Sequence, residues 1–599
     1  MCGIVGYSGG KNCVGIIMEG LKKLEYRGYD SAGIAFEEPQ GLDVLKAVGR
    51  VENLEKLVKS RKVKSNCAIA HTRWATHGKP CVLNSHPHTD CKGEVAIVHN
   101  GIIENYAELK AVLSKKGHKF ASETDSEIIA HLIEEELKKQ KDFFKAFVLA
   151  VKKLKGAYAL AAAYKNAPGV ICAAKKQSPL VIGKGDGEYY LASDVPAFLN
   201  YTNKAIFLED GDLAKITPSS CEVFNLSGVK QNRKVNVIKW SPSAAQKGGY
   251  KHFMIKEIFD QPQATKDTIS TLPADIKKAF GIAPAAAKKI KGLYIVACGT
   301  AYHAALSAKY VIEHFAKLPV EVETASEFKY RSINFQKNWL FIAVSQSGET
   351  ADTLAALMNA KKAGLKTLSI CNVVGSTITR ASDYTVYTHC GPEISVASTK
   401  AFTSQLAVLY SFALHMARQH GVLGKAEFDK LYKEFQTLPE LISQTLKDEQ
   451  SVKKIAKEVY KSNSYIFLGR NASFPIALEG ALKLKEISYL HAEGFAGGEI
   501  KHGPIAIIDK DMPVVALAPK GSLYEKMISS CQEVSARGAK LIIISNTPTK
   551  GAVLVPYSNE YLFPILAVIP LQLLAYYISD LRGREIDRPR NLAKSVTVE

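Results

Sequence analysis

The sequence predicts an α+β N-terminal domain followed by two similar α/β domains, each built on a doubly wound parallel sheet. Three observations support this fold class. Residues 1 to about 239 contain short β-rich runs with helical patterns between them. From about residue 285, apolar strands alternate with helices of roughly 10 to 15 residues, which is typical of βαβ units. This second half also repeats, because YIVACG at 294–299 is echoed by YIFLGR at 465–470.

In the N-terminal part, two helices are predicted among about eight strands. The helical patterns are NYAELKAVLSKKG (105–117) and DSEIIAHLIEEELKKQ (125–140), with Asp125 as the N-cap of the second. The strand runs are GIVGY, SAGIAF, NCAIAHTRW, EVAIVHNG, YALAAAY, GVICAA, PLVIG and EYYLAS. Residues 240–253 are rich in Pro, Gly and Ser, so they predict a linker.

Composition sets limits on the class of protein. The chain has 599 residues, 47% of them hydrophobic, and a formal net charge of +20. Because the lysines are scattered and no nucleic-acid-binding motif accompanies them, we expect a solvated basic surface and no nucleic-acid partner. The apolar stretch 561–581 contains Pro564, Pro570 and Gln572, so it predicts a buried helix rather than a membrane span.

The eleven cysteines are dispersed and include no CxxC pair, which favours a reducing cytoplasm over a disulfide framework. One local group, Cys81, His86, His88 and Cys91, matches no standard zinc spacing. We therefore expect no metal.

SQSGET (345–350) lies between a predicted strand and helix, at the sheet edge where ligands bind. Backbone N–H groups at the helix start, together with hydroxyl and amide side chains of this motif, would suit a phosphate group. A serine-rich turn that only caps the helix is the alternative. CGTAYHA (298–304) makes a similar turn one strand earlier. Because GxxxxGK[ST] is absent, a nucleoside triphosphate is not implied.

Three features near the C-terminus stay ambiguous from spacing alone. Residues 479–493 look helical, and Lys483 and Glu486 are three residues apart on one face, where a surface ion pair is the default interpretation. His502 lies in a loop before a proline, and Lys594 lies in a polar, irregular tail.

Cys2 directly follows the initiator methionine. If Met1 is removed, Cys2 carries a free α-amino group with a pKa of about 7.7 to 8.0. One residue would then supply both a thiol nucleophile and the base that activates it.

Several collinear motifs resemble a known family from residue 2 to 599. MCGIVGY, LEYRGYDSAGIA, AHTRWATHG, HNGIIEN and SETDSE resemble the class II glutamine amidotransferase domain. ACGTA, SQSGET, VASTKAFT, EGALKLKEIS, EIKHGP and PRNLAKSVTVE resemble the paired sugar-isomerase (SIS) domains fused to it in the bacterial-type glutamine–fructose-6-phosphate aminotransferases. The resemblance implies an N-terminal nucleophile hydrolase-like αββα sandwich followed by two SIS subdomains. The implied limits are 2–239 for the glutaminase domain, 240–253 for the linker, 285–425 and 455–590 for the SIS subdomains, and 591–599 for a catalytic tail.

The resemblance also implies a glutamine site. Cys2 would attack the glutamine amide, and Asn100 with the backbone N–H of Gly101 would form the oxyanion hole. Arg73 would hold the substrate carboxylate and Asp125 its ammonium group. The remaining pocket residues would be Trp74, Thr76, His77 and His86, with Trp74 gating an ammonia passage.

For the sugar site, the resemblance implies that Lys594 forms a Schiff base with fructose 6-phosphate and that His502 opens the ring. Glu486 would move a proton from C1 to C2, with Lys483 as its proton partner. The implied binding residues are Cys298, Gly299, Thr300, Ser345, Gln346, Ser347, Thr350, Val396 and Ser398. One departure is Ala301, where the family commonly has a serine that reaches the phosphate.

The implied activity converts L-glutamine and fructose 6-phosphate to L-glutamate and glucosamine 6-phosphate, with no cofactor, in a cytoplasmic homodimer that contacts neither nucleic acid nor membrane. Two alternatives stay open. Another class II amidotransferase would need a pyrophosphate or ATP site, and none is visible. A sugar-phosphate-sensing regulator would lack Glu486, His502 and Lys594, and it would usually carry a helix-turn-helix, which we do not find.

Overall fold

A computed structural model describes residues 2–74, 78–238 and 247–597. Residues 76 and 77, and residues 240–246 of the predicted linker, lie outside this description. The chain divides into two compact units, residues 1–242 with 595–599, and residues 243–594. Each unit is described by itself.

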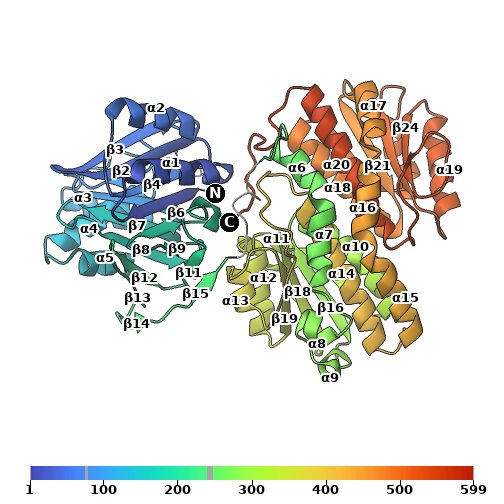
Figure 1. The fold of residues 1–599 in the computed structure, drawn as a ribbon, viewed down its shortest axis with the longest axis horizontal. Coiled ribbons are helices and arrows are strands. Elements are labelled where there is room, and N and C mark those ends of the chain that lie inside the picture. The colour runs from blue at the N-terminus through green and yellow to red at the C-terminus, as the bar shows by residue number, and fades with distance from the viewer. Residues whose placement is uncertain (1, 75–77, 239–246, 598–599) are drawn as a thin grey trace. The chain divides into compact units, whose positions relative to one another are not determined.

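The first unit is built on two antiparallel sheets (Figure 1). The first has the order β15-β11-β9-β10-β1-β4-β2-β3 and the second the order β14-β13-β12-β8-β7-β6-β5. The strands of the first sheet are β1 (Gly3–Ser8), β2 (Ser31–Glu38), β3 (Gly41–Val48), β4 (Cys67–Arg73), β9 (Val181–Lys184), β10 (Tyr189–Ala192), β11 (Lys204–Phe207) and β15 (Val235–Val237). Those of the second are β5 (His88–Thr89), β6 (Val95–Ile103), β7 (Gly156–Tyr164), β8 (Ile171–Lys176), β12 (Leu213–Ile216), β13 (Cys221–Phe224) and β14 (Lys230–Gln231).

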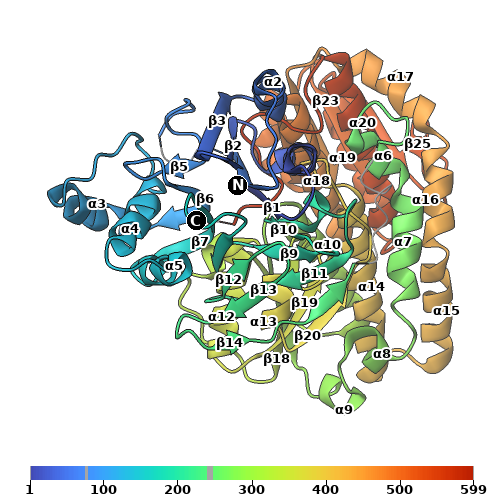
Figure 2. The same ribbon diagram turned by 60° about the vertical axis from the view of Figure 1, so that its left-hand side comes forward.

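Helices cover the outer faces of the two sheets, so the unit is an αββα sandwich (Figures 1 and 2). One apolar layer lies between the sheets and includes Ile4, Ile69 and Val98. A second layer lies under α1 and α2, and a third under the other helices. The helices are α1 (Cys13–Leu24), α2 (Val51–Arg61), α3 (Tyr106–Lys115), α4 (Glu127–Leu137) and α5 (Phe143–Val151).

Two expectations for this unit need correction. The sequence reading found only the helices near α3 and α4, and it missed α1, α2 and α5. Asp125 is not the N-cap of α4, because Ser126 occupies that position. The Asp125 carboxylate instead accepts hydrogen bonds from the backbone N–H of Ile103 (2.7 Å) and the hydroxyl of Ser126 (3.2 Å). This side chain is therefore bound both by β6 and by the N-cap residue of α4.

The second unit contains two five-stranded parallel sheets with the same strand order. The first runs β17-β16-β18-β19-β20 and the second β22-β21-β23-β24-β25. Because β16 and β21 contain the two repeated sequences, the predicted internal repeat is confirmed. The strands are β16 (Gly292–Ala297), β17 (Val320–Thr324), β18 (Trp339–Ser345), β19 (Lys366–Cys371), β20 (Tyr384–Tyr387), β21 (Ser464–Gly469), β22 (His491–Ala496), β23 (Pro513–Ala518), β24 (Lys540–Ser545) and β25 (Val553–Leu554).

One hydrophobic core spans both halves of this unit, with buried residues from α10, α14, α18 and α20. Figure 2 shows α7 running close to α14 and α16. The helices of the first half are α6 (Phe253–Phe259), α7 (Gln261–Ser270), α8 (Ile276–Phe280), α9 (Pro284–Ala287), α10 (Thr300–Ala316), α11 (Ala325–Phe328), α12 (Ala351–Lys362), α13 (Thr377–Ala381) and α14 (Lys400–Gln419). Those that follow are α15 (Lys425–Gln436), α16 (Leu438–Leu446), α17 (Glu449–Val459), α18 (Phe474–Ser488), α19 (Tyr524–Ser535) and α20 (Phe563–Leu581).

The apolar stretch near the C-terminus forms α20 and is buried, as predicted. By length and composition, α20 is the one helix in the described residues that could cross a membrane, but 89% of its most apolar window is buried inside the protein. The predicted helix 479–493 needs a correction. It ends at Ser488, where Tyr489 adopts a left-handed conformation (φ 64°), and the chain continues as β22.

Candidate functional site

Cys2 lies directly before β1, the strand between β4 and β10 in the first sheet. Its Sγ accepts a hydrogen bond from the backbone N–H of Trp74 (3.2 Å). Its carbonyl oxygen accepts hydrogen bonds from Asn100 Nδ2 (3.0 Å) and Arg27 Nε (3.3 Å). These contacts from separate strands and turns hold the residue in place while its side chain stays partly exposed.

Asn100 and Gly101 lie next to each other on β6. The amide oxygen of Asn100 accepts a hydrogen bond from His71 Nε2 (3.0 Å), which turns its NH₂ group toward Cys2. Burial lowers the pKa of His71 to about 3, so this ring is neutral. Gly101 has φ 136°, and a Cβ there would lie 2.0 Å from the carbonyl oxygen of Ala157. Only glycine fits this position.

Arg73 and His86 are two further residues predicted for the glutamine site. Arg73 ends β4 with its side chain buried, and its Nη2 donates to the carbonyl of Gly78 (3.2 Å). His86 is buried and stacks on His71 with 4.1 Å between the ring centres. Burial holds the pKa of His86 well below its usual value, so this ring is also neutral. Thr76 and His77 lie outside the described residues.

In the second unit, a buried polar cluster joins α18 to α10. Lys483 Nζ lies 3.2 Å from Glu479 Oε1 and 2.6 Å from Glu486 Oε2. It also donates to Thr300 Oγ1 (3.0 Å). Glu479 in turn accepts hydrogen bonds from Thr300 Oγ1 (3.0 Å) and His303 Nδ1 (2.8 Å). The interpretation of Lys483 and Glu486 as a surface ion pair is wrong, since Lys483 is fully buried.

The charged groups in this cluster shift the pKa values of one another. Burial disfavours the charged Lys483, but the carboxylates of Glu479 and Glu486 outweigh it and raise the lysine pKa. Burial also raises the pKa of Glu486, against the opposing pull of Lys483. The Lys594 charge also lowers the pKa of Glu486, to a smaller extent than Lys483 does. Glu486 is therefore a stronger base than an exposed glutamate.

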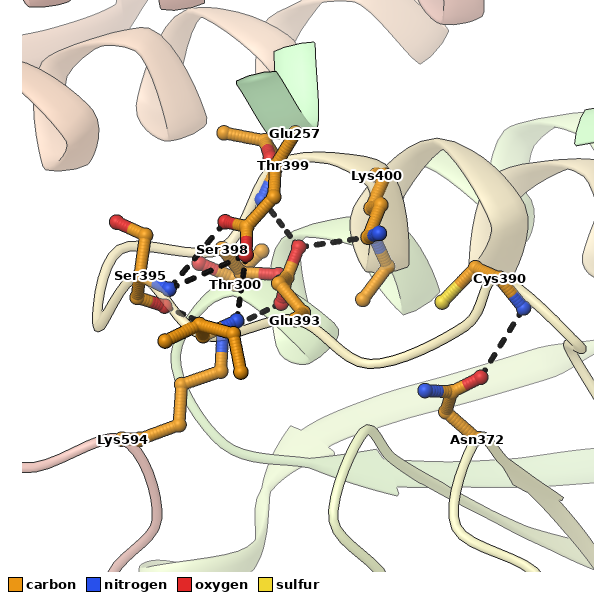
Figure 3. Close-up of polar contacts among 12 residues, drawn as sticks. Glu257, Thr300, Asn372, Cys390, Glu393, Ser395, Ser398, Thr399, Lys400 and Lys594 are labelled. Atoms are coloured by element: carbon orange, nitrogen blue, oxygen red, sulfur yellow. Dashed lines mark hydrogen bonds and ion pairs between the residues drawn. The ribbon is translucent and has the colours of Figure 1, made fainter. Parts of the chain in front are cut away.

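Lys594 contacts an acidic side chain and a backbone carbonyl group (Figure 3). Its Nζ forms an ion pair with Glu393 Oε2 and donates to the carbonyl of Ser395 (2.8 Å). The Ser398 hydroxyl donates to the same Glu393 oxygen (3.0 Å). Although burial opposes ionisation, the Lys594 ammonium lowers the pKa of Glu393. The ammonium is thus held by an ionised carboxylate.

A second acid, Glu257, lies beside this pair (Figure 3). It accepts hydrogen bonds from the backbone N–H groups of Ile394 and Ser395. Burial and the neighbouring Glu393 carboxylate raise the pKa of Glu257 to about 8. At neutral pH one of these two acids is therefore ionised and the other largely protonated.

The SQSGET motif forms the turn between β18 and α12. Ser345 Oγ accepts a hydrogen bond from the N–H of Gly348 (3.0 Å) and lies 3.2 Å from Thr350 Oγ1. Ser347 Oγ accepts from the N–H of Glu349 (3.2 Å). Gly348 has φ 65°, and a Cβ there would lie 2.0 Å from Ser376 Oγ. The turn thus collects hydroxyl groups at the start of a helix, where an anion is favoured.

The remaining predicted sugar-site residues differ in burial and in their contacts. Cys298 and Gly299 form the turn between β16 and α10, which corresponds to the SQSGET turn between β18 and α12. Cys298 Sγ lies 3.7 Å from Thr353 Oγ1. Val396 is buried, and Gln346 is half-buried. His502 lies on an exposed 3₁₀ turn (Glu499–His502). In the described part of the chain, no hydrogen bond or ion pair joins His502 to Lys594, Glu486 or Lys483.

Comparison with known proteins agrees with this two-part architecture. A glutamine amidotransferase domain family matches residues 76–200, and the SIS domain family matches residues 288–415 and 458–579. Two curated relatives are named glutamine–fructose-6-phosphate aminotransferase (isomerizing). The chain is 46% identical over 610 residues to that of Clostridium tetani and 48% identical over 606 residues to that of Thermococcus kodakarensis, with 100% of both chains covered each time.

The chain belongs to the family of isomerizing glutamine–fructose-6-phosphate aminotransferases. A solved structure agrees for the second unit, the C-terminal domain of glucosamine-fructose-6-phosphate aminotransferase from Francisella tularensis. It is 42% identical with a TM-score of 0.55, and the match covers 57% of this chain and 99% of that one. The predicted family and fold class are thereby confirmed.

Sequence reasoning missed three residues that the structure places among the family motifs. Glu479 and His303 complete the cluster around Lys483, and Glu393 holds Lys594. A signal existed for Glu479, since it precedes Lys483 by four residues and so shares its helix face. None existed for Glu393, whose contact with Lys594 spans 201 residues of sequence.

Proposed function

We propose that this enzyme transfers the amide nitrogen of L-glutamine to fructose 6-phosphate, which yields L-glutamate and glucosamine 6-phosphate. One observation carries the proposal. The chain holds both a cysteine at position 2, whose carbonyl group is bound by the Asn100 amide, and a buried lysine, Lys594, that is paired with Glu393.

In the first half-reaction, removal of Met1 frees the α-amino group of Cys2. This amine takes the thiol proton, and the thiolate attacks the glutamine amide carbon. The oxyanion that forms accepts hydrogen bonds from Asn100 Nδ2 and the Gly101 N–H. The amine then protonates the leaving nitrogen, ammonia departs, and water hydrolyses the thioester to glutamate. Arg73 and Asp125 bind the carboxylate and ammonium of the substrate, and Thr76, His77 and His86 line the pocket.

In the second half-reaction, the hydroxyls of Ser345, Ser347 and Thr350, with Thr300 and the Gln346 amide, bind the sugar phosphate. Cys298, Gly299, Val396 and Ser398 complete the pocket. His502 opens the ring, and Lys594, after passing its proton to a neighbouring carboxylate, forms an imine at C2. Ammonia replaces the lysine, and Glu486 moves a proton from C1 to C2 with Lys483 as its partner. Water taken up in glutamine hydrolysis is balanced by the water lost when the imine forms.

We further propose that ammonia passes between the sites inside the protein, with Trp74 as its gate, because released ammonia would be protonated and diluted. The domain limits we propose are those of the sequence analysis, 2–239, 285–425 and 455–590, with 591–599 as a catalytic tail. We also propose a cytoplasmic homodimer assembled through the SIS domains.

The deciding experiment incubates the untagged protein with glutamine and fructose 6-phosphate without ATP and detects glucosamine 6-phosphate by mass spectrometry. An uncleaved N-terminal extension should abolish glutamine hydrolysis. Borohydride reduction in the presence of fructose 6-phosphate should trap the sugar on Lys594. No amino sugar in the first assay would overturn the proposed activity, and an adduct mapped to another lysine would overturn the role of Lys594.

A further inference from the structure

A second group of polar side chains lies in the first unit, apart from Cys2. Cys91 is in the turn between β5 and β6, His118 is in the loop after α3, and His131 and Glu134 share one face of α4. One ligand-type atom from each residue lies within 4.8 Å of all the others. Within the described residues, no other group of this kind is found.

The distances between these atoms are close to the edges of a tetrahedral metal site. Cys91 Sγ lies 3.6 Å from His118 Nδ1 and 3.5 Å from His131 Nδ1, and the two Nδ1 atoms are 3.1 Å apart. Glu134 Oε2 lies 3.1 Å from His118 Nδ1 and 3.6 Å from His131 Nδ1. A tetrahedron with ordinary zinc–sulfur, zinc–nitrogen and zinc–oxygen bonds has edges of about 3.3 to 3.6 Å. Three of the five distances lie in this range, and the two distances of 3.1 Å are slightly shorter.

The second ring nitrogen of each histidine, Nε2, faces a carboxylate. His118 Nε2 lies 2.9 Å from a carboxylate oxygen of Glu135, and His131 Nε2 lies 3.5 Å from one of Glu127. Since a carboxylate accepts hydrogen bonds, a proton on His118 Nε2 would be donated to Glu135 and would leave His118 Nδ1 as the metal-binding nitrogen. The Nδ1 atoms of both rings face each other and the Glu134 oxygen. A metal cation between these three atoms would bind all of them.

The surroundings favour a metal ion in that position. The side chains of His118 and His131 are each 1% exposed, and that of Glu134 is 10% exposed. A ring that donates its outer N–H to a carboxylate is the usual arrangement of a metal-bound histidine. A Cys91 thiolate and the Glu134 carboxylate carry two negative charges, which a divalent ion neutralises.

We propose that Cys91, His118, His131 and Glu134 form a structural zinc site in the N-terminal unit. Sulfur, imidazole and carboxylate ligands in tetrahedral array suit Zn²⁺, and four protein ligands leave no open position for catalysis. On binding, the Cys91 thiol loses its proton to solvent and the sulfur bonds to zinc. The site ties the β5–β6 turn to the segment 118–134, which includes Asp125 of the glutamine site.

The first test measures metal on the full-length protein. After dialysis against Zn²⁺ and removal of loosely bound ions, we expect about one zinc per chain by elemental analysis. Replacement by Co²⁺ should give the visible absorption of a tetrahedral site and a near-ultraviolet thiolate-to-cobalt band. Less than a tenth of an equivalent of zinc, with no thiolate-to-cobalt band, would overturn the proposal without bearing on the glutaminase reaction.

Matched variants assign the ligands. Cys91→Ser should lose the thiolate-to-cobalt band and at least ten-fold in zinc affinity, whereas Cys81→Ser, a cysteine ten residues earlier, should keep both. Cys2→Ala should also keep both, which excludes metal held by the catalytic thiol. If Cys91→Ser does not fold, the Cys2→Ala and Cys81→Ser spectra still decide, because loss of the band in either contradicts the site.

A third variant tests the outer contacts. Glu135→Gln leaves all four ligands but weakens the acceptor for His118 Nε2, so zinc affinity should fall about 10- to 100-fold while the cobalt spectrum keeps its tetrahedral form. Glu123→Gln on the same segment is the control and should bind zinc as the unmodified protein does. Equal zinc affinity in both variants would contradict the proposed orientation of His118.

Discussion

The two reaction centres of this chain handle charge in opposite ways. Around Cys2 the contacts come from backbone groups, the Asn100 amide and one charged group, the Arg27 guanidinium, and burial keeps His71 and His86 neutral. In the second unit, Lys483 lies between two carboxylates and Lys594 is paired with Glu393, all with little or no exposure. A nucleophile that carries its own base needs few charged partners, whereas proton transfer between carbons needs several. Changes at the second centre should therefore affect folding as well as activity.

The largest effect is expected from Cys2→Ala, which removes the nucleophile. Glutamine hydrolysis should fall to background, while unfolding and fructose 6-phosphate binding should stay unchanged, because no charge is left unpaired. Glutamate release measures the loss of hydrolysis, and calorimetry measures whether fructose 6-phosphate still binds. Residual glutaminase activity would show that another group attacks the amide.

Lys483→Met should lower both the stability and the activity of the second unit. It leaves the buried carboxylates of Glu479 and Glu486 without their cation, which costs about 3 to 5 kcal/mol of unfolding free energy. Amino-sugar formation should be lost as well. Denaturant unfolding of the full chain provides the measurement, with the exposed Lys485→Met on the same helix as the control. Similar stabilities for the two variants would contradict the role of the buried cluster.

Asn100→Ala sharpens the contrast at the first centre. Losing one oxyanion-hole donor should lower kcat for glutamine hydrolysis about 100- to 1,000-fold. Its effect on stability should be smaller than that of Lys483→Met, because the lost partner is a neutral amide. A rise in KM with unchanged kcat would assign Asn100 to substrate binding instead.

Glu257→Gln tests the pH dependence of the second unit. The pKa of Glu257 is raised from 4.5 to about 8, so between these pH values the folded state binds a proton that the unfolded state has lost. Stability from this group is therefore lost as pH rises toward 8. Relative to Glu257→Gln, the unmodified protein should lose about 2 kcal/mol between roughly pH 6 and pH 8. If the difference in unfolding free energy between the two proteins does not change with pH, the raised pKa of Glu257 is contradicted.

The smallest effect is expected from Ala301→Ser, which restores the hydroxyl common in the family at the start of α10. A hydrogen bond to a charged group contributes about 1.5 to 3 kcal/mol, so KM for fructose 6-phosphate should fall about ten-fold with little change in kcat. Steady-state kinetics with saturating glutamine measure this. An unchanged KM would place residue 301 outside the phosphate site.

Local patterns in the sequence predicted local structure well. Alternating strands and helices predicted β16, α10, β18 and α12, and three-residue spacing predicted the pairing of Lys483 with Glu486. Long-range packing was not predictable. The burial of Lys483 depends on Thr300, 183 residues away. The partners of Cys91 lie 27 to 43 residues further along the chain, so short spacing rules could not connect them.

The side chain of Glu479 belongs to the second repeat, yet it is held by Thr300 and His303 of the first. Each duplicated half therefore supplies what the other lacks, and neither would retain a complete polar centre if expressed alone. A cut between the two repeats would leave the buried Glu479 carboxylate without two of its hydrogen-bond donors, Thr300 and His303.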